Sequence, residues 1–285
     1  MQREWGIIGC AYMAREYCKV LVSRGIKPRV FSRDLNSSHV KSFRAMFPEL
    51  EVARIEHIRD EPKNWLVCTS IESHENICAG LTGTIFCEKP YAQTPDYADR
   101  NITILMNRRY YYWVDYMKKV IDGGRIVKII ANVPEKSANA LITQSIHVID
   151  LLWYLSGPFH PATRIGQQSP SFILSTDSKI PLVINMNYGA HENFSLRFYS
   201  DDGVVYEARP LEAFNIIEGM EVQEPSDEFP LRSYKPVIRP LEYKPTDHKP
   251  GLAELMDALL QGTDTKLPSL SAHRQVHAWM QDNML

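Results

Sequence analysis

The sequence lacks the features that mark membrane, secreted and nucleic-acid-binding proteins. No apolar run approaches the roughly 20 residues that cross a bilayer, and the start, MQREWGIIGC, lacks the basic-then-apolar order of a signal peptide. The 32 basic and 34 acidic residues are interspersed and leave a formal charge of -2, so no basic stripe favours nucleic acid. We therefore expect a cytoplasmic protein that acts on a small molecule and binds neither membrane nor nucleic acid.

Cysteine is scarce, and its placement argues against a redox or metal role. All five cysteines lie in the first third of the chain, mostly in apolar segments, and none forms a C-x-x-C pair. This pattern is typical of reduced thiols in a core. The scattered histidines and acidic residues show no metal-ligand spacing, so we predict no metal site.

The first part of the chain has the rhythm of an α/β domain. The 285 residues, 44% of them hydrophobic, suffice for two domains with full cores. Up to about residue 107, short β-rich runs alternate with amphipathic stretches, as in βαβ units that feed a parallel sheet. Six predicted strands make a complete doubly wound sheet. They lie at residues 4–8, 29–32, 51–54, 65–69, 84–87 and 102–106.

Beyond residue 107 the pattern changes to strands separated by turn signals, which indicates a mostly antiparallel sheet. The proline-rich stretch 224–250 predicts a surface excursion. Helices are predicted at about 110–121, 142–155, 252–261 and 271–283, and strands at 126–133 and between 162 and 217.

These patterns predict an α/β protein of two domains. A dinucleotide-binding Rossmann domain with a doubly wound parallel sheet is expected at residues 1–108. An α+β domain for substrate binding and oligomerisation, with a large, open and mostly antiparallel sheet, is expected at residues 109–285. The closing helices at about 252–283 could pack back toward the first domain.

A reduced form of the G-x-G-x-x-G motif follows the first predicted strand. Residues 9–14, GCAYMA, keep only the first glycine. Alanine can serve the close packing of helix on strand, but it suits the close approach of a pyrophosphate less well. The strand before the motif and the helix after it are the context that a dinucleotide site requires. The candidate cofactor-binding residues here are Gly9, Ala11, Tyr12 and Met13.

The second predicted strand ends about 20 residues further on, where such sites contact the ribose. Ser32 and Arg33 offer donors and positive charge to a 2′-phosphate, whereas Asp34 could accept from the 2′-hydroxyl of NAD. We therefore predict NADP as the cofactor, with NAD possible. The alternative is that Arg33 is a solvated loop cation.

Polar segments then follow two further predicted strands, at the ends where open α/β sheets bind ligands. Residues 68–74, CTSIESH, and 87–90, CEKP, resemble the A-T-P-N-x-x-H-like turn and the E-K-P motif of the Gfo/Idh/MocA family of NAD(P)-dependent oxidoreductases. Residues 107–109, NRR, resemble the family's N-x-R segment. Residues 145–152, SIHVIDLL, are similar to the helix that carries its site histidine.

The resemblance implies hydride transfer between nicotinamide and a carbonyl or hydroxyl carbon of a sugar, nucleotide sugar or sugar-derived small molecule. It implies that Lys89 stabilises charge on the reacting oxygen or passes a proton, and that His147 acts as acid, base or orienting group. The Lys89-Pro90 bond is often cis in relatives, and the outer face of the second sheet often forms a dimer, so a homo-oligomer is expected. Further cofactor contacts fall on Thr69, Ser70, His74, Glu88 and Lys89, although His74 could equally stabilise its turn.

The chain departs from the family where many relatives place an aspartate, four residues before the histidine. Thr143 stands there, and its hydroxyl cannot act as a base near neutral pH. On an α-helix it would share a face with His147. We expect Thr143, Gln144 and Tyr110 to contact substrate.

Two alternatives to the sugar oxidoreductase stay open. The missing aspartate is compatible with a reductase of a conjugated or imine-like acceptor, as in the biliverdin-reductase-like branch. Together with the reduced glycine motif, it is also compatible with a catalytically weakened cofactor-binding protein that acts as a sensor or assembly partner.

Overall fold

The computed structural model describes residues 4–58, 63–136, 141–167 and 169–284, which form two compact units. The first contains the chain up to Tyr110 together with Pro245–Ala278. The second contains Tyr111–Lys244 and the residues from Trp279 on. The C-terminal third is therefore divided between the units and does not continue one domain from residue 109 to the end.

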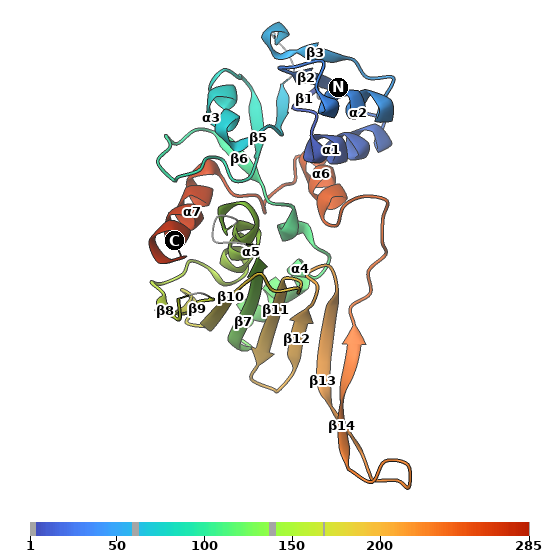
Figure 1. The fold of residues 1–285 in the computed structure, drawn as a ribbon, viewed down its shortest axis with the longest axis vertical. Helices are drawn as coiled ribbons and strands as arrows, with labels where there is room; N and C mark the ends of the chain where they lie inside the picture. The colour runs from blue at the N-terminus through green and yellow to red at the C-terminus, as the bar shows by residue number, and fades with distance from the viewer. Residues whose placement is uncertain (1–3, 59–62, 137–140, 168, 285) are drawn as a thin grey trace. The chain divides into compact units, whose positions relative to one another are not determined.

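The first unit is built on a parallel sheet that confirms the predicted doubly wound fold (Figure 1). Its strands are β1 (Trp5–Ile8), β2 (Arg29–Ser32), β3 (Val52–Arg54), β4 (Asn64–Val67), β5 (Thr84–Glu88) and β6 (Ile102–Leu105). They lie in the order β3-β2-β1-β4-β5-β6, and every pairing is parallel. The helices are α1 (Tyr12–Ser23), α2 (Ser38–Met46), α3 (Ile71–Ala79) and α6 (Leu252–Gln261), with 3₁₀ turns η1 (Ile55–His57) and η2 (Asn107–Tyr110).

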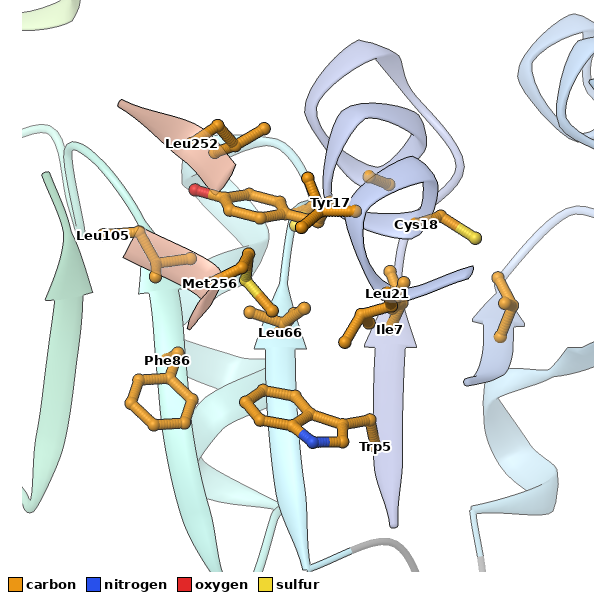
Figure 2. Packing of buried hydrophobic residues seen from close by; sticks show 14 of the residues in the cluster. Trp5, Ile7, Tyr17, Cys18, Leu21, Leu66, Phe86, Leu105, Leu252 and Met256 are labelled. Atoms are coloured by element: carbon orange, nitrogen blue, oxygen red, sulfur yellow. The ribbon is translucent and has the colours of Figure 1, made fainter. Parts of the chain in front are cut away.

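The core of this unit depends on a helix from the end of the chain. Figure 2 shows side chains of the sheet, among them Leu66 and Phe86, close to residues of α1 and α6. Leu252 and Met256 of α6 are fully buried in the same cluster as Tyr17 of α1. Because the apolar face of α6 is covered here, α6 is part of the Rossmann layer although it lies more than 140 residues after β6 in the sequence.

The same C-terminal segment covers the connection between β5 and β6. The described residues 89–101 contain no helix, although a crossover between parallel strands usually does. Ser269 instead forms an antiparallel bridge with Thr103 of β6. Five residues after Ser269, in α7 (Leu270–Met284), Arg274 donates to the carbonyl of Tyr97 over 3.0 Å. The helix α7 thus packs where a crossover helix is missing.

The second unit confirms the expected large, mostly antiparallel sheet. Its strands are β7 (Ile126–Glu135), β8 (Thr163–Ile165), β9 (Ser171–Ser175), β10 (Pro181–Tyr188), β11 (Ser195–Ser200), β12 (Val205–Ala208), β13 (Phe214–Gln223) and β14 (Ser233–Pro240). Their order is β14-β13-β12-β11-β7-β10-β9-β8, with only β7 and β10 parallel among the described pairs. The helical elements are α4 (Val114–Asp122), the π-helical turn η4 (Leu141–Ser145) and α5 (Ile146–Ser156).

Two sequence-based boundaries are wrong in this unit, whereas the expected surface excursion is exposed throughout residues 224–240 and contains a strand. The helix expected at 110–121 begins at Val114, because Trp113 turns inward, stacks on Phe214 and donates to the carbonyl of Leu211 over 2.8 Å. The helix expected at 142–155 starts as the π-turn η4. The expected surface excursion is a hairpin of β13 and β14, whose prolines lie on the edge strand, where a missing N–H costs no ladder bond.

Two chemical features of the described residues bear on function. All five cysteines are buried and free of disulfides. Among the described helices, none has the length and apolar character needed to cross a membrane.

Candidate functional site

The turn after β1 can be formed only by glycine. Gly9 has a φ of +105° and donates its N–H to the carbonyl of Phe31 over 2.8 Å. A Cβ at this position would lie 2.5 Å from the carbonyl oxygen of Cys68, inside any allowed contact. The chain therefore passes close to β4 and enters α1 directly.

The N-terminus of α1 has the character of an anion site. Ala11 at the N-cap supplies no side-chain cap, and within the first turn, all of which is described, there is no acidic residue. The first N–H groups of a helix have no partner inside the helix and attract anions such as phosphate. The first N–H groups of α1 can therefore donate to a ligand or to water.

A pocket of about 390 Å³ opens at the carboxyl ends of β1, β2 and β4. It brings together six of the predicted cofactor residues, which are Gly9, Ala11, Ser32, Arg33, Thr69 and Ser70. Sequence reasoning missed part of its wall, since a single pattern cannot show which loops meet at a sheet edge. The missed lining residues include Cys10, Ser37, His39, Ile55 and Cys68. Tyr12 and Met13, also predicted, do not line this pocket.

Arg33 and Asp34, which directly follow β2, place a cation and a carboxylate in the pocket wall. The Oδ1 of Asp34 accepts from the N–H of Asn36 over 2.8 Å, and the hydroxyl of Ser32 donates to the carbonyl of Asp34 over 3.3 Å. Arg33 lines both this pocket and a neighbouring hollow of about 520 Å³ beside η1 and α3. The geometry thus offers positive charge where the carboxylate is already held in an Asx turn.

The thiols in the pocket wall are uncharged. Burial raises the pKa of Cys10 to about 11, against the opposing charges of Arg44 and Arg15. Burial also raises the pKa of Cys68 well above its usual value, with Glu88 adding to the effect. Neither thiol therefore carries a negative charge at neutral pH that would repel an anionic ligand.

Buried polar contacts hold the loop that carries Lys89. Glu88 accepts from the hydroxyl of Tyr17 over 2.7 Å and from the N–H of Lys89 over 3.3 Å. The ring nitrogens of His74 lie 3.0 Å from the carbonyl of Pro90 and 3.1 Å from that of Thr69. Burial lowers the pKa of His74 despite these carbonyls. The Lys89-Pro90 bond is cis.

Two of the predicted cofactor residues therefore have a structural role. Glu88 and His74 are buried and do not line the pocket at the carboxyl ends of β1, β2 and β4. They join α1, the Thr69 turn and the Lys89 loop into one framework. His74 matches the turn-stabilising alternative, and Glu88 fixes the backbone of the lysine that follows it.

The segment that resembles N-x-R connects the sheet to the C-terminal residues of the same unit. Asn107 donates to the carbonyl of Pro250 over 3.1 Å, and the hydroxyl of Tyr110 donates to Asp264. The ammonium of Lys266 lies 5.0 Å from the centroid of the Tyr110 ring. Tyr110, predicted to contact substrate, is buried and its hydroxyl is engaged.

In the second unit, the π-turn changes the predicted relation of Thr143 to His147. Thr143 is half-buried and Gln144 exposed within η4, while His147 is buried in the first turn of α5. The i, i+4 stacking assumed for a continuous α-helix does not apply across a π-turn. Lys89 belongs to the first unit and His147 to the second.

A buried carboxylate that sequence reasoning missed lies beside this turn. Glu135, at the end of β7, is 6% exposed and accepts from the hydroxyl of Ser145, two residues before His147. Burying a carboxylate is costly unless it is hydrogen-bonded, which Ser145 provides. No sequence motif identifies Glu135 as a site residue, because its contact with Ser145 depends on where β7 ends and where η4 begins.

Comparison with known proteins gives similarity in fold alone. No protein-family model matches the sequence, and no curated protein matches it. The UDP-N-acetylglucosamine 3-dehydrogenase of Acidithiobacillus ferrooxidans matches over 98% of this chain and 96% of its own, at 14% identity and a TM-score of 0.70.

Two further solved structures were determined with nicotinamide cofactors. A levoglucosan dehydrogenase in complex with NADH matches over 98% of this chain and 96% of its own, at 17% identity and a TM-score of 0.70. An oxidoreductase from Agrobacterium radiobacter in complex with NAD+, L-tartaric acid and magnesium matches over 99% and 95%, at 10% identity and a TM-score of 0.70. Their fold extends over nearly the whole of this chain.

Proposed function

We propose that this chain is an NAD(P)-dependent oxidoreductase of the Gfo/Idh/MocA type, acting in the cytoplasm on a sugar, nucleotide sugar or sugar-derived small molecule. The observation that carries the proposal is the pocket at the carboxyl ends of β1, β2 and β4, with the Gly9 turn at one end and Arg33 at the other. The three structural neighbours described above are dehydrogenases or oxidoreductases, and they support the same reaction class.

The residues of this pocket fit a dinucleotide. The Gly9 turn lets the backbone approach a pyrophosphate, the N–H groups of α1 can bind it, and Ser32 and Arg33 can bind a 2′-phosphate. We therefore propose NADP as the preferred cofactor. When bound, its nicotinamide supplies or accepts the hydride.

The first test is a parallel fluorescence titration of the protein with NADPH and NADH. Saturable binding of both, tighter for NADPH, is expected. If neither binds, the proposed function is wrong.

Replacing Arg33 by alanine is expected to weaken NADPH binding about tenfold or more and to change NADH binding by less than about threefold. A charge-assisted hydrogen bond to a phosphate contributes on this scale, and only NADPH carries the 2′-phosphate. The matched control is Arg29→Ala at the amino end of the same strand, which should leave both affinities unchanged. Equal weakening of the two cofactors would refute the 2′-phosphate assignment.

Lys89 and His147 are proposed as the proton-transfer groups. Lys89→Ala and His147→Ala are each expected to lower kcat/KM about 10²- to 10⁴-fold, the usual contribution of a general acid or base. NADPH oxidation over a panel of sugar and nucleotide-sugar carbonyls is the measurement, with circular dichroism as a folding control. Unchanged turnover in either variant on an accepted substrate would remove that residue from the site.

A cofactor-binding protein without turnover is the second candidate, and Thr143 is the observation that favours it. A threonine cannot replace an ionisable aspartate. Glu135 weighs against this candidate, because it keeps a carboxylate beside the same turn. NADPH binding without oxidation across the panel would favour the sensor or assembly role.

We also propose a homodimer through the sheet of the second unit. The register of β13 and β14 places Met220, Val222, Tyr234 and Ile238 on one side of the hairpin, all of them exposed. Exposed apolar patches of this kind mark association surfaces. Tyr234→Asp is expected to shift the sedimentation coefficient from dimer to monomer, whereas Lys235→Asp on the opposite side should not. A monomeric wild type would refute the proposal.

A further inference from the structure

We propose that Lys249 is a cofactor-binding residue whose ammonium binds the pyrophosphate of the dinucleotide. The inference rests on the proposed function and adds to it a residue outside the G-x-G-x-x-G-like motif. The lysine lies in the segment that leads into α6, some 240 positions after the motif in the sequence.

The ammonium of Lys249 is held over the first turn of α1. It lies 5.6 Å from the centroid of the Tyr12 ring and 3.5 Å from the Sδ of Met13. Tyr12 and Met13 are the first two residues of α1, directly after the turn at Gly9 and Ala11. Lys249 therefore lies at the end of the helix where the donors for an anion are exposed.

The backbone around Lys249 is fixed relative to α1. The carbonyl of Lys249 accepts from the N–H of Leu252 over 3.0 Å, and the next carbonyl, of Pro250, accepts from Asn107 over 3.1 Å. Leu252 is fully buried in the cluster that contains Tyr17 of α1 (Figure 2). Because Lys249 is itself half-buried, part of the entropy cost of ordering its side chain is met before a ligand binds.

The charge arrangement is the reverse of the usual one. The helix dipole makes the N-terminus positive, so lysines are favoured at C-termini and acidic residues at N-termini. In α1, whose residues are all described, the first turn has no acidic residue and Ala11 provides no cap, yet a lysine lies over it. A pyrophosphate could accept from the helix N–H groups and from the lysine at the same time.

The pocket itself supplies little positive charge at this end. Its described lining around Gly9, from Ile8 to Ala11 and from Cys68 to Ser70, has no basic side chain, while Arg33 lies at the ribose end. Two phosphate groups would therefore lack a cation in the pocket wall. Arg15, the fourth residue of α1, is the competing candidate on this helix, since its charge reaches Cys10.

The experiment titrates NADH and NADPH into the wild type, Lys249→Gln, Lys249→Arg, Arg15→Gln and the control Lys27→Gln. Lys27 is exposed beyond the opposite end of α1 and gives the same change of charge. Lys249→Gln should weaken both cofactors by the same factor, about tenfold, and Lys249→Arg by less than about threefold. Competition by adenosine, which lacks both phosphates of the pyrophosphate, should be unchanged. Thermal unfolding of each variant verifies that it folds.

Each outcome supports or overturns the proposal. If the wild type binds both cofactors and Lys249→Gln binds them equally well, the Lys249 assignment is wrong and the proposed function stands. Loss confined to NADPH, an equal loss for adenosine, or a loss in Arg15→Gln alone would also overturn it. If the wild type binds neither cofactor, the inference falls together with the proposed function.

Discussion

A fragment of residues 1–110, expressed alone, is expected not to fold, although it contains all six strands of the parallel sheet and helices α1 to α3. The reason is α6, which buries Leu252, Leu255, Met256 and Leu259 in the core of the first unit. Burial of one such side chain contributes about 1.5–3 kcal/mol, so the four together contribute about 6–12 kcal/mol. This is comparable with the whole stability of a domain, about 5–15 kcal/mol.

The measurement is urea unfolding of the fragment followed by circular dichroism, with a matched rescue. Residues 1–110 joined to 245–278 by a flexible linker should regain a cooperative transition, because closing a longer loop costs little additional entropy. The linker replaces the second unit and leaves every contact of α6 available. Cooperative unfolding of the unlinked fragment would contradict the role assigned to α6.

The Rossmann sheet could be predicted because its signals are local. Each strand is a short buried run bounded by turn residues, and the first two are joined by the Gly9 motif and α1. Ligand-binding loops of such a sheet lie at the carboxyl ends of its strands, so residues such as Arg33 and Thr69 could be placed in the pocket from sequence. These local sequence signals were sufficient to predict the parallel sheet of the first unit.

The remaining features depend on contacts between distant segments. The pattern of α6 shows that one face is apolar but not that Tyr17 and Phe86 lie in the cluster it packs into. The π-turn before α5 and the meeting of Glu135 with Ser145 depend on the length of the connection after β7. Lys249 reaches Tyr12 for the same reason, since only the packing of α6 brings it there.

Acidification from pH 6.5 to 4 is expected to destabilise the first unit strongly, and His273 of α7 is the main cause. Its side chain is 0% exposed, and within the described part of the chain neither ring nitrogen has a hydrogen-bond partner. Burial lowers its pKa to about 3, and the charges of His277, Arg109 and Lys89 act in the same direction. Burial also lowers the pKa of His277.

The direction of the effect follows from proton binding in the two states. An unfolded histidine has a pKa of about 6.5, so between pH 6.5 and 3 the unfolded chain binds a proton that buried His273 does not. The free energy of unfolding therefore falls with falling pH by up to about 1.4 kcal/mol per pH unit, or about 3 kcal/mol by pH 4. Urea unfolding at pH 7, 6, 5 and 4, with hydrogen exchange of β1 and β4 amides as the probe, measures this slope for the first unit.

His273→Leu separates this histidine from the carboxylates that also titrate in acid. In this variant the free energy of unfolding should depend less steeply on pH, by an amount that corresponds to about one proton. His191→Leu, at an exposed position, should leave the wild-type pH dependence unchanged. An unsatisfied buried polar atom costs about 1–3 kcal/mol, and leucine has a similar volume without polar atoms, so His273→Leu should be at least as stable as the wild type at pH 7. A variant with the wild-type pH slope would show that His273 gains a proton or a partner in the folded protein. In that case the buried nitrogens of α7 would have to be solvated and the acid sensitivity would have to come from other groups.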